Sequence, residues 1–206
     1  MCIRDSLAAT PDASPSDRQW VHIRLAELAQ RLERLALAEK HFRQALQAST
    51  PDGFLLAAYA DLLLDQQRFG DVLQLLKTQE RSDALLLRIA LAEHGMNLPS
   101  AKDRAQVLNE RFAAARMRKE SVHEQEEARL ALHLEQNAGK ALPLAQDNWA
   151  AQREPRDARI FLEAALAAKR PDAAQPVLAW VQSSGIEDRY LRQLAQKLQA
   201  MKGAGK

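Results

Sequence analysis

The sequence predicts an all-α protein built as an array of helical hairpins, and three observations support this prediction. Hydrophobic residues make up 47% of the chain and only 7 of its 206 residues are glycine, and strong helix formers such as Ala, Leu, Gln and Arg are frequent. Short stretches rich in Pro and Asp recur between long amphipathic segments, where one helix ends and the next is capped. Small and large apolar residues recur at a spacing of 34, which indicates repeated helix pairs.

The first sixteen residues do not fit the helical pattern. Residues 1–6, "MCIRDS", match the translation of a transposase sequencing adapter, so we expect an adapter-derived artefact that supplies the only cysteine. On this hypothesis the true start codon, and with it earlier repeats of the same chain, lies upstream. Residues 7–16 contain two prolines and small polar residues, which predicts a linker that ends in a helix N-cap at Ser16 or Asp17.

Two helix pairs follow, at about residues 17–51 and 52–81. Ala26 of the first pair corresponds to Ala60 of the second, and Phe42 corresponds to Leu76, each 34 residues later. A small position and a large apolar position are therefore each repeated from the first pair to the second. We expect each pair to be unstable alone and to be stabilised by stacking on the next.

Three further pairs and a capping helix are predicted from weaker repeats. The third pair, at about 82–118, begins with an apolar helix that matches the second pair at an interval of 30. The fourth and fifth pairs, at about 119–154 and 155–186, match at an interval of 33. In both of them a proline, Pro143 or Pro176, is expected in the first turn of the second helix. Residues 187–203 predict an amphipathic cap, and 204–206 a tail.

The segment "RLAELAQRLERLALAEKHFRQALQASTPD" resembles the tetratricopeptide repeat family. Most of residues 17–195 also resembles the C-terminal part of a set of uncharacterised bacterial proteins that contain this repeat. The resemblance implies a right-handed superhelical array, a tetratricopeptide-like α-solenoid. It also implies a protein or peptide as partner, no cofactor and no catalytic residues.

The resemblance also implies a binding groove lined by the first helix of each pair. Carried over position by position, the groove residues in this sequence are Glu27, Gln30, Arg31, Asp61, Asp65, His123, Glu126, Arg159 and Glu163. We therefore expect a non-enzymatic protein–protein interaction scaffold. Two alternatives stay open: an exported cell-envelope assembly or secretion factor, and a regulatory module of an enzyme whose catalytic domain lies upstream. Export signals in similar proteins suggest the periplasm, and the cytoplasm is the alternative.

Several other classes of function are not expected. The formal net charge is +2 and basic residues alternate with acidic ones, so no nucleic-acid-binding face is predicted. No apolar run reaches the ~18 residues of a membrane span. The stretch "HEQEE" at 123–127 lacks the second histidine of a zinc-binding helix, so no metal site is expected. No motif of a nucleophilic or nucleotide-binding enzyme occurs.

Overall fold

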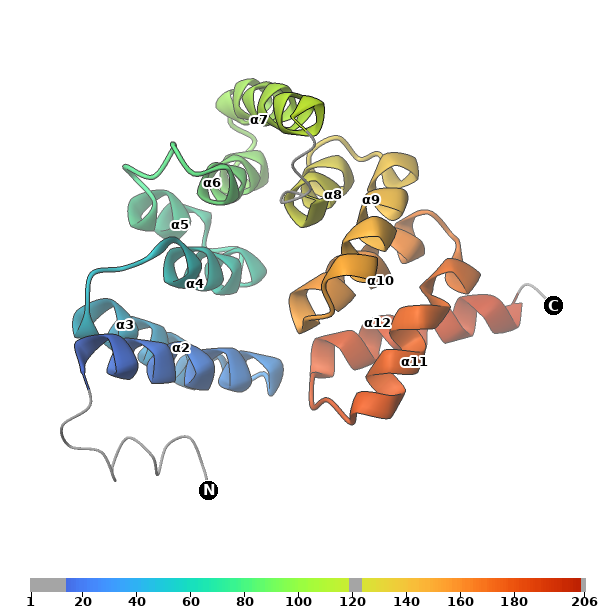
Figure 1. The fold of residues 1–206 in the computed structure, drawn as a ribbon, viewed down its shortest axis with the longest axis horizontal. Coiled ribbons are helices and arrows are strands. Elements are labelled where there is room, and N and C mark those ends of the chain that lie inside the picture. Colours follow the sequence, from blue (N-terminus) through green and yellow to red (C-terminus); the bar gives the residue numbers. More distant parts are fainter. Residues whose placement is uncertain (1–13, 119–123, 205–206) are drawn as a thin grey trace. The chain divides into compact units, whose positions relative to one another are not determined.

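A computed structural model describes residues 14–118 and 124–204 and shows only helices in them, which confirms the predicted all-α class (Figure 1). The helices are α2 (Pro15–Arg31), α3 (Leu35–Ala48), α4 (Gly53–Asp65), α5 (Phe69–Leu75), α6 (Asp83–Gly95), α7 (Ser100–Met117), α8 (Glu124–His133), α9 (Ala138–Ala151), α10 (Pro155–Ala167), the short 3₁₀ helix η1 (Pro171–Ala174), α11 (Gln175–Ser184) and α12 (Arg189–Ala204).

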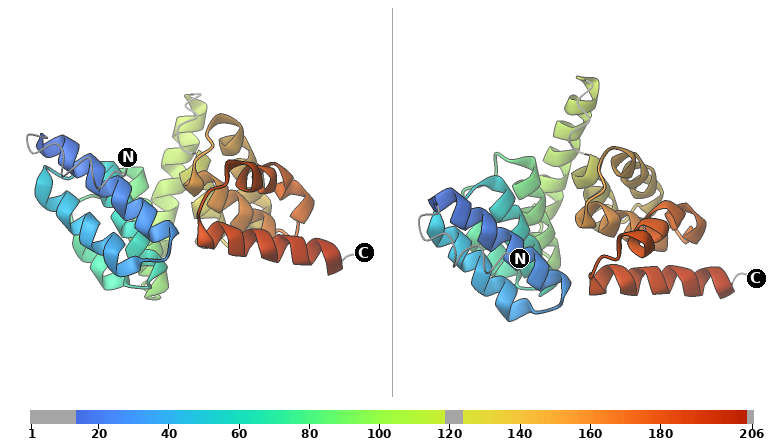
Figure 2. Two further views of the ribbon diagram at one scale, coloured as in Figure 1. Left: turned by 90° about the horizontal axis from the view of Figure 1, so that it is seen from below. Right: turned by 60° about the horizontal axis from the view of Figure 1, so that its bottom comes forward.

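The chain divides into two compact units, Met1–Met96 and Asn97–Lys206. Within the first unit, α2 packs along α3, and α4 contacts α2, α3, α5 and α6 (Figure 2). Within the second unit, α8 packs on α9, and α10 contacts α8, α9, α11 and α12. Helices that are close in the sequence therefore pack together in both units.

The helix α2 begins earlier than expected. Ser14, rather than Ser16 or Asp17, is the N-cap, and Pro15 occupies the first turn, where its missing N–H costs nothing. Ser14 and Asp17 form a capping box, in which Asp17 N donates to Ser14 Oγ at 3.1 Å and Ser14 N donates to Asp17 Oδ2 at 3.3 Å.

The core of the first unit contains the four residues related by the 34-residue spacing. Ala26 and Ala60 are fully buried, as are the larger Phe42 and Leu76, and Ala38 of α3 is buried with them. Small side chains at the helix crossings let the backbones approach closely, and the large ones fill the space between pairs. The Phe42 ring also stacks on the Tyr59 ring, with centroids 5.3 Å apart.

Close packing also explains Gly95 at the end of α6. A Cβ atom at this position would lie 2.4 Å from Cζ of Phe69 on α5, a distance that no real contact tolerates. The glycine thus makes room for an aromatic ring in the first unit.

The core of the second unit joins α8, α9, α10 and α12. It contains Trp149, Phe161 and three leucines of α12, namely Leu191, Leu194 and Leu198. The polar residues Arg192, Lys197 and Gln199 of α12 are exposed, as the amphipathic pattern indicates. Tyr190, near the start of the same helix, is 41% exposed.

The two prolines predicted at equivalent positions differ. Pro176 lies in the first turn of α11, as expected. The expectation is wrong for Pro143, which lies inside α9, because Asn137 caps that helix and α9 starts at Ala138. The asparagine side chain accepts from Lys140 N at 3.0 Å, which extends the helix by a turn before the proline.

Five short turns share one backbone feature. A non-glycine residue with φ of 53–57° lies between paired helices at Glu33, Gln67, Asn97, Gln136 and Lys169. Three of these turns have the same hydrogen bonds: the N–H after the left-handed residue donates five residues back, as in Arg34 N to Ala29 O, Arg68 N to Leu63 O and Arg170 N to Ala165 O. This is the Schellman arrangement that ends a helix, here formed without glycine.

Candidate functional site

An exposed aromatic side chain marks one face of α2 and α4. Trp20 of α2 is 56% exposed. The guanidinium carbon of Arg24 lies 5.6 Å from the centroid of the Trp20 ring and 5.3 Å from that of Phe54, so it is within cation–π distance of both rings. A hollow of about 450 Å³ opens here, lined by Ser16, Asp17, Gln19, Trp20, Ile23, Arg24, Asp52 and Phe54.

This face of α2 continues into the groove residues carried over from the resemblance. Arg24, Glu27 and Arg31 follow Trp20 at helical spacing, so all four side chains share one side of the helix. Glu27 accepts from Arg24 Nη1 at 2.8 Å. Arg31 is half-buried, and its Nε is buried without a hydrogen-bond partner among the described residues.

The two predicted groove residues of α4 contact neighbouring helices instead of projecting alone into solvent. Asp61 accepts from Arg88 Nη2 at 2.7 Å, and Asp65 accepts from Gln30 Nε2 at 3.2 Å. The first contact joins α4 to α6 and the second joins α2 to α4.

Arg88 is the more constrained member of its ion pair. Its side chain is 5% exposed, against 25% for Asp61. The guanidinium also donates to the carbonyl oxygens of Ala84 at 2.7 Å and Ala57 at 3.3 Å. A buried guanidinium is tolerated because its charge is paired and its donors are used.

In the second unit, Arg159 and Glu163 belong to a cluster of four residues from three helices, which we call the Glu163 cluster. Glu163 Oε1 accepts from Arg159 Nε at 2.8 Å and from Tyr190 Oη at 3.0 Å, and Glu163 Oε2 lies 3.2 Å from His133 Nε2. The Arg159 guanidinium carbon lies 4.6 Å from the centroid of the Tyr190 ring. The cluster thus ties α10 to α8 and α12.

The electrostatics of the Glu163 cluster favour the charged carboxylate. The Glu163 side chain is 10% exposed, and this burial raises its pKa. The hydrogen bond to His133 and the charges of Arg159 and His133 outweigh burial, so the pKa falls from 4.5 to about 2.

The remaining predicted groove residues are less informative. Glu126 is half-buried on α8, and His123 lies outside the described residues. The structure therefore brings Gln30 together with Asp65 and Arg159 together with Glu163, and it gives Asp61 a partner that the sequence analysis missed.

Several residues of these clusters could have been found in the sequence. Arg88 stands inside "DALLLRIALAEHG", where a lone cation among apolar residues requires a buried partner. Phe54 follows Trp20 by 34 residues, the same interval that relates the core positions. His133 and Tyr190 carry no comparable signal, because their pairing with Glu163 depends on how three helices pack.

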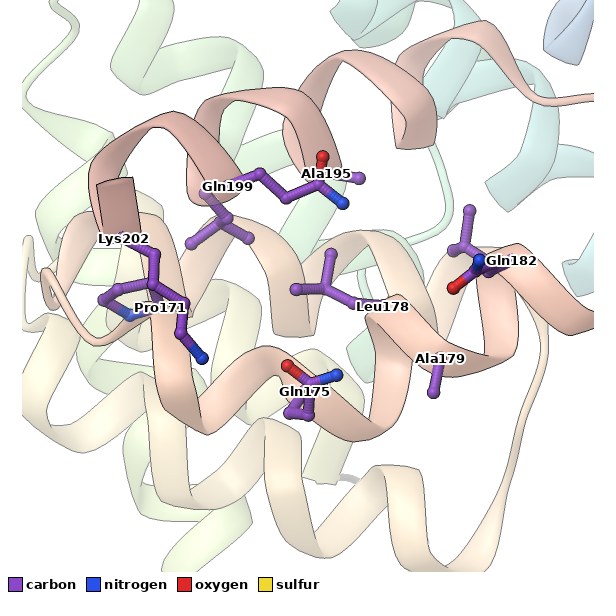
Figure 3. A pocket seen from close by; sticks show the side chains of 10 residues that line it. Pro171, Gln175, Leu178, Ala179, Gln182, Ala195, Gln199 and Lys202 are labelled. Atoms are coloured by element: carbon purple, nitrogen blue, oxygen red, sulfur yellow. The ribbon is translucent and has the colours of Figure 1, made fainter. Parts of the chain in front are cut away.

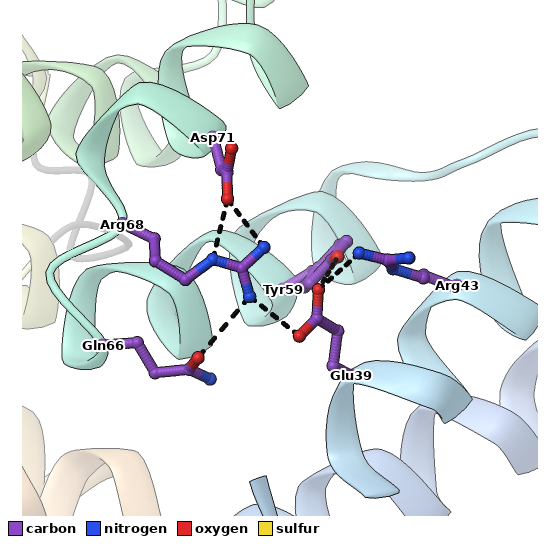
Figure 4. Close-up of polar contacts among 6 residues, drawn as sticks. All are labelled: Glu39, Arg43, Tyr59, Gln66, Arg68 and Asp71. Carbon is purple, nitrogen blue, oxygen red and sulfur yellow. Dashed lines mark hydrogen bonds and ion pairs between the residues drawn. The ribbon is translucent and has the colours of Figure 1, made fainter. Parts of the chain in front are cut away.

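Another polar cluster joins the first two helix pairs (Figure 4). Glu39 of α3 accepts from Arg68 Nη1 at 2.7 Å, from Arg43 Nη2 at 2.7 Å and from Tyr59 Oη at 3.2 Å. Arg68 Nε also donates to Asp71 Oδ2 at 2.7 Å. The hydrogen bond from Arg68 is the main cause that lowers the pKa of Glu39, against the opposing effect of burial. These contacts fix α3 against α4 and the turn before α5, which is a structural role.

A histidine pair links α2 to α3. Nδ1 of His22 lies 3.2 Å from Nδ1 of His41, and the two rings stack with centroids 5.4 Å apart. Burial lowers the pKa of His22, and His41 lowers it further. Burial also lowers the pKa of His41, where Gln44 opposes the shift and Lys40 adds to it. Both imidazoles are therefore harder to protonate than free histidine.

A second hollow lies between α11 and α12 in the second unit, with a volume of about 410 Å³ (Figure 3). Its walls include Leu178, Val181 and Leu198, and glutamines from both helices surround them. Lys202 lines the same hollow and pairs with Asp172 at 2.7 Å. It has no exposed aromatic ring like Trp20.

The described residues show neither a metal-binding constellation nor a membrane-spanning helix. Residues 14–118 and 124–204 bring no three His, Cys, Asp or Glu side chains into an arrangement that could hold a metal ion. No helix in the same ranges combines the length and the hydropathy needed to cross a bilayer.

Compared with known proteins, the chain matches no protein-family model, no curated protein and no solved structure.

Proposed function

We propose that this protein is a helical-repeat scaffold of the tetratricopeptide kind, whose pairs stack as a right-handed superhelix and which binds a peptide or protein partner. The observation that carries the proposal is the exposed Trp20 beside Arg24 and Phe54, over a hollow of about 450 Å³. An aromatic side chain left in solvent next to a pocket is typical of binding surfaces, where Trp and Arg are enriched.

The repeated turns support the repeat architecture. Left-handed residues Glu33 and Gln67 are 34 residues apart, and Gln136 and Lys169 are 33 apart, which are the intervals found in the sequence. Helix pairs joined by such turns bury their apolar faces against neighbouring pairs.

The binding face in this proposal is the side of α2 and α4 that carries Trp20, Arg24 and Glu27. The Asp61–Arg88 pair and the Glu163 cluster hold helices together, so in this proposal each stabilises its own unit. Of the predicted groove residues, this proposal assigns Glu27 to the binding face and Asp61 and Glu163 to contacts that position the helices.

Affinity capture followed by cross-link mapping tests the proposal. The whole protein is used to capture partners, in parallel with Trp20→Ala and Arg24→Ala variants and with Gln47→Ala, an exposed control on α3. We expect at least one partner to cross-link to α2 or α4 and to be lost from both face variants but retained by the control. Partners that are captured equally by all four proteins would overturn the proposed face.

A further inference from the structure

We propose that the hollow beside Trp20 binds an arginine side chain of an extended peptide. This inference rests on the proposed function and names the chemistry that the site recognises. It follows from two aromatic rings, two exposed carboxylates and the way the chain's own Arg24 is held.

The aromatic part of the site already holds a guanidinium group. Arg24 lies within 5.6 Å of both the Trp20 and the Phe54 ring centroids, which is the range of a cation–π contact. Trp20 remains 56% exposed with Arg24 in place, so the residue is still accessible to a second planar cation.

The carboxylates give the hollow a negative character. Arg24 is matched in charge by Glu27, 2.8 Å away. Asp17 and Asp52 line the same hollow and both are exposed. Asp17 accepts from Ser14, and Asp52 caps α4 by accepting from Leu55 N at 2.7 Å. An ionised carboxylate offers about four acceptor positions, so each aspartate can also receive donors from a ligand.

The combination of aromatic rings and carboxylates favours an arginine side chain over a lysine side chain. A guanidinium is planar, stacks on an indole face and donates two parallel hydrogen bonds to a carboxylate. A lysine ammonium is a compact, strongly hydrated charge that satisfies only part of this set. Two exposed carboxylates also repel an acidic peptide, so the charge complement of the hollow is a cation.

Capped octapeptides provide a direct test. One contains two arginines in a Gly/Ser background, and the others carry lysine, citrulline or glutamate at the same positions. Citrulline keeps the shape of arginine without its charge. Binding is followed by two-dimensional NMR through the indole N–H signal of Trp20, which is assigned with a Trp20→Phe variant.

We expect the arginine peptide to shift the Trp20 signal with a Kd in the micromolar to millimolar range, and the citrulline and glutamate peptides to bind at least tenfold more weakly. The protein variant Asp17→Asn/Asp52→Asn should weaken arginine binding at least fivefold. Asparagine caps α4 about as well as Asp52 does, and the amide oxygen of an asparagine at position 17 can still accept from Ser14 N, so the variant should keep most of its Tm and isolate the effect of charge.

Three results would overturn the inference: equal binding of the citrulline peptide, unchanged binding to the double asparagine variant, or signal changes confined to the second unit. Failure of the proposed function is distinguishable. If a partner captured through Trp20 is found while no arginine peptide binds, the scaffold stands and the arginine site alone is removed.

Discussion

Each unit has an ion pair that involves the ninth residue of one of its helices, but the more buried partner is the cation in the first unit and the carboxylate in the second. Asp61 is the ninth residue of α4 and Glu163 is the ninth residue of α10. In the first unit the buried group is the guanidinium of Arg88, at 5% exposure, whereas in the second it is the carboxylate of Glu163, at 10%. Arginine stays protonated at any pH a folded protein meets, but a carboxylate does not. The difference teaches that the buried group that needs a partner is a permanent cation in one unit and a titratable carboxylate in the other.

Breaking the ion pair of the first unit should give the largest effect. Asp61→Ala leaves Arg88 buried without its carboxylate, and we expect the free energy of unfolding to fall by about 3 kcal/mol. Urea denaturation measures the change. Asp65→Ala, which removes an exposed carboxylate bonded to Gln30, is the matched control and should cost less than about 0.5 kcal/mol.

A paired replacement separates charge burial from packing in the same unit. Asp61→Leu combined with Arg88→Met removes both charges, and we expect the double variant to recover most of the loss seen for Asp61→Ala. If the double variant is as unstable as Asp61→Ala, the ion pair is not what stabilises the α4–α6 contact.

Acid should destabilise the second unit through protonation of Glu163. The folded pKa of Glu163 is about 2, below its ordinary 4.5, so its contribution is complete above pH 4.5 and is lost as the pH falls toward 2. The shift corresponds to about 3 kcal/mol. Unfolding measured between pH 2 and 6 should show this loss in the wild type and a flatter profile in Glu163→Gln. Equal slopes would contradict the assignment.

The first unit should respond at milder pH through the histidine pair. Because the pKa values of His22 and His41 are both lowered below 6.5, the unfolded chain takes up protons first as the pH falls. Stability of the first unit should therefore decrease below pH 6.5 and level off below the folded pKa values. Amide hydrogen exchange in α2 and α3 follows the effect, and His41→Gln should reduce it while leaving exchange in α10 unchanged.

The smallest effect concerns the turns, where we expect the two units to behave alike. Gln67→Gly and Lys169→Gly place glycine at left-handed positions and should each stabilise their unit by about 0.5–1 kcal/mol, after allowing for the greater entropy of the unfolded chain. Alanine at the same positions should be nearly neutral. Thermal unfolding of all four variants measures this, and a destabilising glycine would show that the side chains hold these turns.

The sequence predicts the helices better than the contacts between them. The periodic apolar residues, together with the Pro–Asp segments that separate the helices, predict that Ala26, Phe42 and Ala60 lie in the core, and all three are buried. This succeeds because the buried face of a helix follows a period that can be read along the chain. The sequence predicted that Pro143 lies in the first turn of its helix. This is wrong because Asn137 caps α9, so the helix begins at Ala138, before the proline.

The polar site residues were only partly predictable. Arg159 and Glu163 are four residues apart on one helix, so their contact follows from helical spacing. The partners that complete their cluster, His133 and Tyr190, come from other helices, and no local pattern in the sequence relates them. The exposure of Trp20 likewise depends on which neighbour covers it, which only the packed structure shows.

The placement of the three tryptophans gives the molecule its own optical reporters. Trp20 belongs to the first unit and faces water, whereas Trp149 and Trp180 of the second unit meet edge to face with centroids 5.3 Å apart. Red-shifted tryptophan fluorescence, which is typical of an indole in water, therefore reports on the first unit. Near-ultraviolet circular dichroism from the coupled indoles reports on the second unit. A single unlabelled sample can thus reveal whether the halves melt together or in turn.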